Sequence, residues 1–193
     1  MPEEPLNLAI IVGSVREGRF GPVVAGWFAE CARRRADLRV DLIDLAETPA
    51  PPLGSTPADA AEAAAREALA GRLAAADAFV VVTPEYNRSF PAALKELIDA
   101  HVTEWQAKPV GFVSYGGISG GLRAVEQLRL VFAELHAVTV RDTVSFHRAK
   151  ERFDAAGRPT DPDSEVAAKV LLDRLTWWGR VLRDARAEHP YAA

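Results

Sequence analysis

Three short segments of this chain combine glycine, proline and hydrogen-bonding side chains in patterns suited to binding a small ligand. They are residues 13–22, 83–91 and 114–122. Each follows a short apolar run and leads into a stretch with helical periodicity. Each is therefore expected to connect a strand to a helix, where free backbone groups can meet a ligand.

The first segment, residues 13–22, has the composition of a phosphate cradle. Small residues let backbone N–H groups approach an anion, and the N-terminus of the following helix adds positive potential. Ser14 supplies a hydroxyl, and Arg16 supplies a fork of charged donors. An ordinary turn, in which the glycines only relieve steric strain, is the alternative interpretation of this segment.

Two familiar phosphate-binding patterns do not fit this loop. The pattern G-x-G-x-x-G fails because Val15 and Arg16 stand where further glycines are needed. The pattern G-x-x-x-x-G-K-[ST] matches in its glycines, but Arg19 and Phe20 replace its lysine and its hydroxyl. Hydrolysis of a nucleoside triphosphate is therefore not expected. The single cysteine, Cys31, falls on the apolar face of the next helix, which excludes a thiol phosphatase that uses this loop.

The other two segments are suited to a planar heterocycle. In residues 83–91 the prolines favour an extended turn with free backbone groups, and Tyr86 offers an aromatic wall. Residues 116–121 include four glycines, so a backbone without side chains could lie against a ring. A capped turn and a flexible loop without a ligand are the alternative interpretations of these two segments.

The elements between these loops predict a single α/β domain over residues 1–193. Apolar runs rich in β-branched residues predict five buried strands, at residues 8–12, 40–43, 79–83, 110–115 and 137–140. Amphipathic stretches between them predict helices, including an Ala-rich helix within 58–78 and a last helix over 166–187. Segments 46–56 and 145–160 lack periodicity and are expected to be loops.

Strict alternation of strands and helices favours a parallel sheet with right-handed crossovers and helices on both faces. Strand order 2-1-3-4-5 would bring the loops after the first, third and fourth strands to one edge, where doubly wound sheets bind ligands. The three loops would then form one site with a phosphate end and a ring end.

Composition limits the classes of partner. A net charge of -4 over 193 residues does not provide the positive surface that nucleic acid requires, so small-molecule partners are expected. No apolar stretch is long enough to span a membrane, and Glu3 and Glu4 stand where a signal peptide would be basic. With a single cysteine the chain cannot form an internal disulfide, which fits a reducing compartment, so a cytoplasmic location is expected.

Several residues outside the loops receive no role in binding. The four histidines lack the spacing of metal ligands, so no metal site is expected. Asp41 and Asp44 are expected to face water. Trp177 and Trp178 are expected to pack on the sheet or at a subunit contact, and Trp105 is a candidate for a dimer seam.

Motifs at these positions resemble the NADPH-dependent FMN reductase family. They are Gly-Ser-x-Arg at 13–16, Pro-Glu-Tyr-Asn at 84–87, Leu-Lys-x-x-Ile-Asp at 94–99 and Ser-Gly-Gly at 119–121. Over residues 8–140, the resemblance implies a flavodoxin-like three-layer α/β/α sandwich that binds FMN without a covalent bond. The residues implied at the phosphate end are Ser14, Arg16, Arg19, Phe20, Gly21, Pro22 and Val23. Those implied around the isoalloxazine ring are Pro84, Glu85, Tyr86, Asn87, Arg88, Ser114, Tyr115, Gly116, Gly117, Ser119 and Gly120.

The sequence departs from the family in one part of the phosphate loop. Members often carry a second hydroxyl there, whereas residues 19–21 have none. Phosphate binding is therefore expected to rely more on backbone donors and on Arg19.

The resemblance also implies an activity. Hydride would pass from NADPH or NADH to bound FMN, and the electrons would then pass to a flavin, quinone or other small acceptor. The cofactor performs this chemistry, so no catalytic acid or base is required. A homodimer or homotetramer is implied as well. A non-enzymatic electron carrier, an FMN-binding module and a scaffold without a cofactor remain as alternatives.

Overall fold

The computed structural model describes residues 4–48 and 54–192. It contains one five-stranded parallel sheet in the order β2-β1-β3-β4-β5, which confirms the predicted topology. The strands are β1 (Leu6–Val12), β2 (Leu38–Asp44), β3 (Ala78–Pro84), β4 (Pro109–Tyr115) and β5 (Val138–Phe146). The helices are α1 (Gly21–Arg33), α2 (Ala60–Ala75), α3 (Ala92–Ala100), α4 (Leu122–Glu134) and α5 (Asp163–Glu188), with 3₁₀ turns η1 (Thr103–Trp105) and η2 (Ala149–Glu151).

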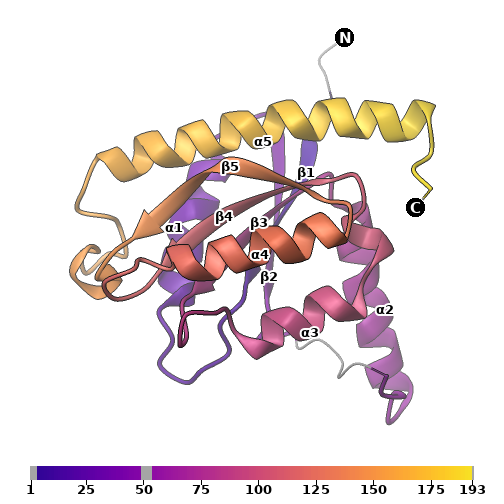
Figure 1. Cartoon of the computed structure of the whole chain (residues 1–193), viewed down its shortest axis with the longest axis horizontal. Coiled ribbons are helices and arrows are strands. Elements are labelled where there is room, and N and C mark those ends of the chain that lie inside the picture. Colours follow the sequence, from indigo (N-terminus) through magenta and orange to yellow (C-terminus); the bar gives the residue numbers. More distant parts are fainter. Residues whose placement is uncertain (1–3, 49–53, 193) are drawn as a thin grey trace.

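Helices cover both faces of the sheet, so the central strands are buried on each side (Figure 1). Successive side chains of a strand point to opposite faces. In β1, Leu8 and Ile10 pack with α1 and α5, whereas Ala9 and Ile11 pack with α2 and α3. This double burial explains why the strands appear in the sequence as continuous apolar runs rather than as alternating patterns.

The fifth strand is longer than predicted. It extends to Phe146, whereas the apolar run that predicted it ends at Val140. Beyond that point Val144 and Phe146 are buried, but the residues between Val140 and Val144 are polar and exposed or half-buried, as expected of an edge strand. The expectation of a loop over 145–160 is therefore wrong at its first residues, and η2 lies within it. The predicted loop at 46–56 falls partly outside the described residues.

Trp105 belongs to the core and does not lie at a surface seam. Its side chain is fully buried, with its ring centroid 4.6 Å from that of Phe79 and 5.4 Å from that of Phe132. Its indole Nε1 donates a hydrogen bond to the carbonyl of Ile98 at 3.3 Å. The proposed role of Trp105 in a dimer seam is therefore wrong, because the 3₁₀ turn η1 directs the ring beneath α4.

We expect Trp105→Ala to lower the free energy of unfolding by about 3–5 kcal/mol, the usual cost of deleting a buried aromatic ring. Trp105→Phe should cost less, because it retains one aromatic ring in the core, although it loses the hydrogen bond to Ile98 and part of the packing of the indole. Urea unfolding followed by circular dichroism would measure both. Equal stability of the wild type and Trp105→Ala would contradict the burial of this side chain.

Candidate binding site at the carboxyl end of the sheet

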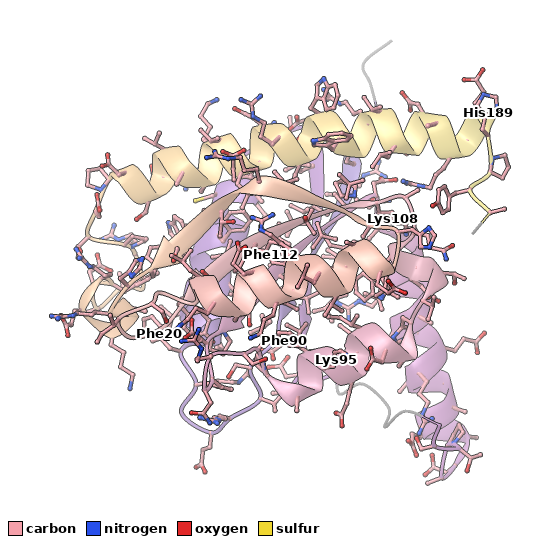
Figure 2. All side chains as sticks on the ribbon, in the orientation of Figure 1. Phe20, Phe90, Lys95, Lys108, Phe112 and His189 are labelled. Atoms are coloured by element: carbon pink, nitrogen blue, oxygen red, sulfur yellow. The ribbon has the colours of Figure 1, made fainter. Side chains whose placement is uncertain are left out.

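The three loops that the sequence singled out meet beyond the ends of β1, β3 and β4. Ser14 Oγ lies 2.7 Å from Tyr86 Oη, so a hydrogen bond joins the loop after β1 to the loop after β3. The backbone N–H of Glu85 donates to the carbonyl of Tyr115 at 3.2 Å and joins the loop after β3 to the end of β4. Figure 2 shows Phe20 on the side toward which the β5 arrow points and Lys108 near the opposite end of the sheet.

A cavity of about 380 Å³ lies between these loops. Loops after β1, β3 and β4 contribute part of its lining: Phe20, Pro84, Glu85, Tyr86, Tyr115, Gly116 and Gly117. The rest comes from the turn after β5: Arg148, Ala149, Lys150 and Glu151. The cavity therefore lies where the predicted ring end of the site was expected, but it has a fourth wall.

This fourth wall was not predicted from the sequence. The backbone N–H of Arg148 donates to the carbonyl of Gly117 at 2.8 Å, and that of Ala149 donates to the carbonyl of Gly116 at 3.1 Å. These bonds fix η2 to the glycine loop. Because β5 pairs with β4, the strand order could have pointed to this turn. Because the fifth strand was predicted to end at Val140, the turn that contains η2 was not expected at the carboxyl edge of the sheet.

The loop after β1 has the free donors of an anion site. Among the described residues, none of the backbone N–H groups of residues 14–18 donates a hydrogen bond to the protein. Helix α1 begins directly after this loop, and no side chain caps its N-terminus. The guanidinium carbon of Arg16 lies 3.6 Å from the centroid of the Tyr86 ring, a cation–π contact that holds the charge beside the cavity.

Arg19 is engaged within the protein. Its Nη1 donates to Asp44 Oδ1 at 2.5 Å and to the carbonyl of Ser14 at 3.0 Å. The hydrogen bond to Asp44 is the main reason why the pKa of Arg19 is raised. The side chain of Asp44 is only 13% exposed, so the expectation that it faces water is wrong. Because Asp44 neutralises Arg19, this ion pair braces the phosphate loop against the end of β2.

Tyr115 places a polar group without a partner at the start of α1. Its side chain is buried, and its Oη has no hydrogen-bond partner among the described residues. Burial is the main reason why the pKa of this phenol is raised. A Cβ added at Gly21 would lie 2.8 Å from Tyr115 Oη, so glycine is what allows this approach. A buried hydroxyl without a partner, next to a helix N-terminus, is a feature that a bound polar ligand would satisfy.

The glycine loop after β4 is shaped largely by packing against β5. The hydroxyls of Ser114 and Ser145 each donate to the carbonyl of Gly120 at 2.8 Å. A Cβ added at Gly120 would lie 2.6 Å from Ser145 Oγ, and the φ angle of Gly120 is +61°. Ser114 and Gly120, both predicted to contact a ligand, therefore support the loop, whereas Gly116 and Gly117 line the cavity.

Other predicted residues lie at the margins of the site. Asn87 and Arg88 form the tip of a tight turn with φ angles of 49° and 70°, closed by hydrogen bonds between the backbones of Tyr86 and Ser89. Pro22 and Val23 line a different cavity, of about 910 Å³, between α1 and the loop over residues 154–162. Although this second cavity is larger, only these two of the predicted residues line it, so it is not the predicted ring site.

Glu85 links the loop after β3 to the start of α4. Its side chain is 5% exposed, and its Oε1 lies 2.5 Å from Nη2 of Arg123. Its Oε2 accepts a hydrogen bond from the backbone N–H of Arg123 at 3.3 Å. Burial by itself would raise the pKa of Glu85, but the hydrogen bond from Ser119 and the contacts with Arg123 outweigh it, so the pKa is lowered. Glu85, predicted to contact a ligand, therefore also fixes the loop after β3 to the start of α4.

We expect Glu85→Gln to reduce the free energy of unfolding near neutral pH by about 1–3 kcal/mol, the scale of lost hydrogen bonds to a charged group. Because the pKa of Glu85 is lower in the folded state, its contribution is fully present above the ordinary value of 4.5 and fades as the pH falls below it. Urea unfolding of both proteins, at neutral pH and well below 4.5, would test this. A deficit independent of pH would contradict the ionised pair.

Comparison with known proteins identifies relatives across most of the chain. The family model for NADPH-dependent FMN reductase matches residues 6–151. A NAD(P)H-dependent FMN reductase of Schizosaccharomyces pombe is 36% identical over 130 residues, which cover 63% of this chain and 65% of the relative. A 2-hydroxy-1,4-benzoquinone reductase of a Burkholderia species is 30% identical over 187 residues, which cover 91% of this chain and 97% of the relative.

Solved structures share the fold. The flavoenzyme NAD(P)H:(acceptor) oxidoreductase FerB from Paracoccus denitrificans has a TM-score of 0.69 and 21% identity, covering 91% of this chain and 98% of that one. A flavodoxin variant from Pseudomonas aeruginosa has a TM-score of 0.55 and 20% identity, covering 91% and 99%. These similarities confirm the flavodoxin-like class. None of the helices in the described chain is long and apolar enough to cross a membrane.

Proposed function

We propose that FMN and its substrates meet in the cavity at the carboxyl end of the sheet. The chain belongs to the NADPH-dependent FMN reductase family, which makes it an FMN-dependent NAD(P)H oxidoreductase. The cavity, of about 380 Å³, falls within the usual range for small-molecule sites. Bound FMN would supply the redox chemistry, namely hydride transfer from the nicotinamide and delivery of the electrons to a small acceptor such as a flavin or quinone.

The polar groups left without partners support this location for FMN. The backbone N–H groups of residues 14–18 and the Arg16 guanidinium would hold the phosphate at the start of α1. The buried Tyr115 hydroxyl would satisfy its hydrogen bond with the cofactor. The ring would lie against Tyr86 and the bare backbone of Gly116 and Gly117. Arg19 would act indirectly, because Asp44 already engages it.

The family membership favours an enzyme over a non-enzymatic electron carrier. For a reductase of this kind, the protein must position the cofactor and leave a face of the ring open to two successive substrates. No acid or base is assigned among the lining residues. The carboxylate of Glu85 is bonded to Arg123, so it holds the loop in place rather than transferring a proton.

Arg16→Ala should weaken FMN binding by about 1.5–3 kcal/mol, the scale of hydrogen bonds to charged groups. Riboflavin, which has the same ring but no phosphate, should bind the variant and the wild type equally. Calorimetric titration of both proteins with both ligands would measure this. An equal loss for riboflavin and FMN would show that Arg16 acts on the ring, and an unchanged FMN affinity would remove it from the phosphate end.

We also propose that the protein is a homodimer joined through α5. The solvent face of this helix exposes an apolar stripe, formed by Val166 (61% exposed), Val170 (37%), Trp177 (58%) and Val181 (44%). Their spacing places them on one side of a helix. Trp178, in contrast, packs against the core as expected.

The order of residues in the stripe supports antiparallel pairing of two copies. Val166 and Val181 are equally distant from the midpoint between Asp173 and Arg174, and so are Val170 and Trp177. Around a two-fold axis at that midpoint, the apolar positions of one helix would face those of the other. Asp173 would face Arg174 of the partner subunit. Within the protein Asp173 already pairs with Arg35 and Lys169, and Arg174 lies 4.0 Å from Asp142, so the apolar stripe rather than this pair supports the dimer.

Trp177→Glu should convert the dimer to monomers, because it places a charge in the middle of the stripe. Leu130→Glu is a matched control, since Leu130 is 75% exposed on α4 and α4 packs on the other face of the sheet. Analytical ultracentrifugation of the wild type and both variants would test this. A monomeric wild type would refute the dimer, and dissociation by Leu130→Glu alone would place the seam on α4.

Finally, we propose that residues 1–193 act as one FMN-binding domain in the cytoplasm. Helix α5 contacts β1, β3, β4, β5 and α1, so the last element of the chain packs against the first strand. The only cysteine, Cys31, is a free and buried thiol, which fits a reducing compartment.

A further inference from the structure

The wall of the cavity that comes from η2 carries positive charge. Arg148 and Lys150 both line the cavity and are exposed. Neither side chain forms an ion pair or hydrogen bond with another described residue. The side chains of Arg88 and Arg152 likewise have no ion pair or hydrogen bond within the described chain, but of these four cations only Arg148 and Lys150 line the cavity.

The other charges around the cavity do not cancel this pair. Glu85 is neutralised by its ion pair with Arg123. Glu151 lines the cavity as the other carboxylate, so it offsets at most one of the two cations. Arg16 adds a further positive charge across Tyr86. A small cleft with an excess of one charge raises the local concentration of ligands of opposite charge.

The backbone fixes the turn from which the two cationic side chains extend. Arg148 has a φ angle of 48°, in the left-handed region that residues other than glycine rarely adopt. Its N–H bonds to the carbonyl of Gly117, and its own carbonyl accepts from Glu151 N at 2.8 Å. Between the cations, Ala149 is buried and anchors the turn. Strained backbone that its surroundings hold firmly is typical of ligand sites.

We propose that Arg148 and Lys150 form a subsite for the phosphate groups of the nicotinamide dinucleotide that donates the hydride. This inference rests on the proposed function, because the donor must enter the same cavity. The FMN phosphate has its own donors in the loop after β1, so η2 is left for a second phosphate-bearing molecule. Arginine and lysine are the side chains best suited to phosphate oxygens, whereas a neutral quinone would gain little from them.

The test compares hydride donors with and without phosphate in the FMN-loaded enzyme. The variant is Arg148→Gln/Lys150→Gln, and the donors are NADPH, NADH and N-benzyl-1,4-dihydronicotinamide, which has no phosphate. We expect KM for NADPH to rise about tenfold or more, which corresponds to the lower end of the free energy lost when hydrogen bonds to charged groups are removed. KM for NADH should rise less, and KM for the phosphate-free donor should not change. kcat should change little for all three.

A matched control and a binding measurement separate this effect from general charge or loss of cofactor. Arg39→Gln/Arg141→Gln removes the same charge from side chains that are 61% and 95% exposed and do not line the cavity, and it should leave every KM unchanged. Calorimetry should show that the η2 variant binds FMN as the wild type does and binds NADP⁺ about tenfold more weakly, the same loss expected in KM.

The outcomes distinguish this inference from the proposed function. If the wild type oxidises NADPH but the η2 variant keeps its KM values and its NADP⁺ affinity, the subsite is refuted and the reductase function stands. An equal rise in KM for the phosphate-free donor would also refute it, because η2 would then act on the nicotinamide or on the flavin. A wild type that binds FMN but oxidises none of the donors would refute both.

Discussion

The binding site depends on the parallel pairing of β1 with β3, of β3 with β4 and of β4 with β5. The carboxyl ends of parallel strands lie at one edge of the sheet, and the register shift between β4 and β5 does not alter this, so four loops begin side by side. Each loop then bonds to its neighbour: Ser14 to Tyr86, Glu85 to Tyr115, and Arg148 to Gly117. The strands bring the loops together, and these bonds join each loop to the next.

The distribution of charge around the cavity follows from which arginines are engaged. Arg19 is paired with Asp44 and Arg123 with Glu85, and both pairs brace loops. Arg16 and Arg148 form no such pair within the described chain: Arg148 lines the cavity, and Arg16 stacks on Tyr86, which also lines it. In a protein of net negative charge, this leaves the positive potential where an anionic cofactor and an anionic donor would be received.

Glycine has two different roles in the site. Gly21 and Gly120 leave room for protein atoms, because a Cβ at either position would approach Tyr115 or Ser145 too closely. Gly117 has open space where a Cβ would be, and it lines the cavity. The glycine-rich sequence after β4 therefore reflects packing against β5 as well as access for a ligand, and composition alone could not separate the two.

The sequence by itself determined the alternation of strands and helices and the three loops, because strands buried on both faces and glycine-rich or proline-rich turns leave strong local signals. The flavodoxin-like strand order was an expectation tied to the family resemblance, and the structure confirms it. The sequence missed the end of β5, whose edge position makes half of the strand polar, and with it the turn that carries Arg148. It also misplaced Trp105 and Asp44. The partners of these side chains lie far away in the chain, at Phe132 and at Arg19. Only the tertiary structure decides which distant groups meet, since no local pattern records the other side of a contact.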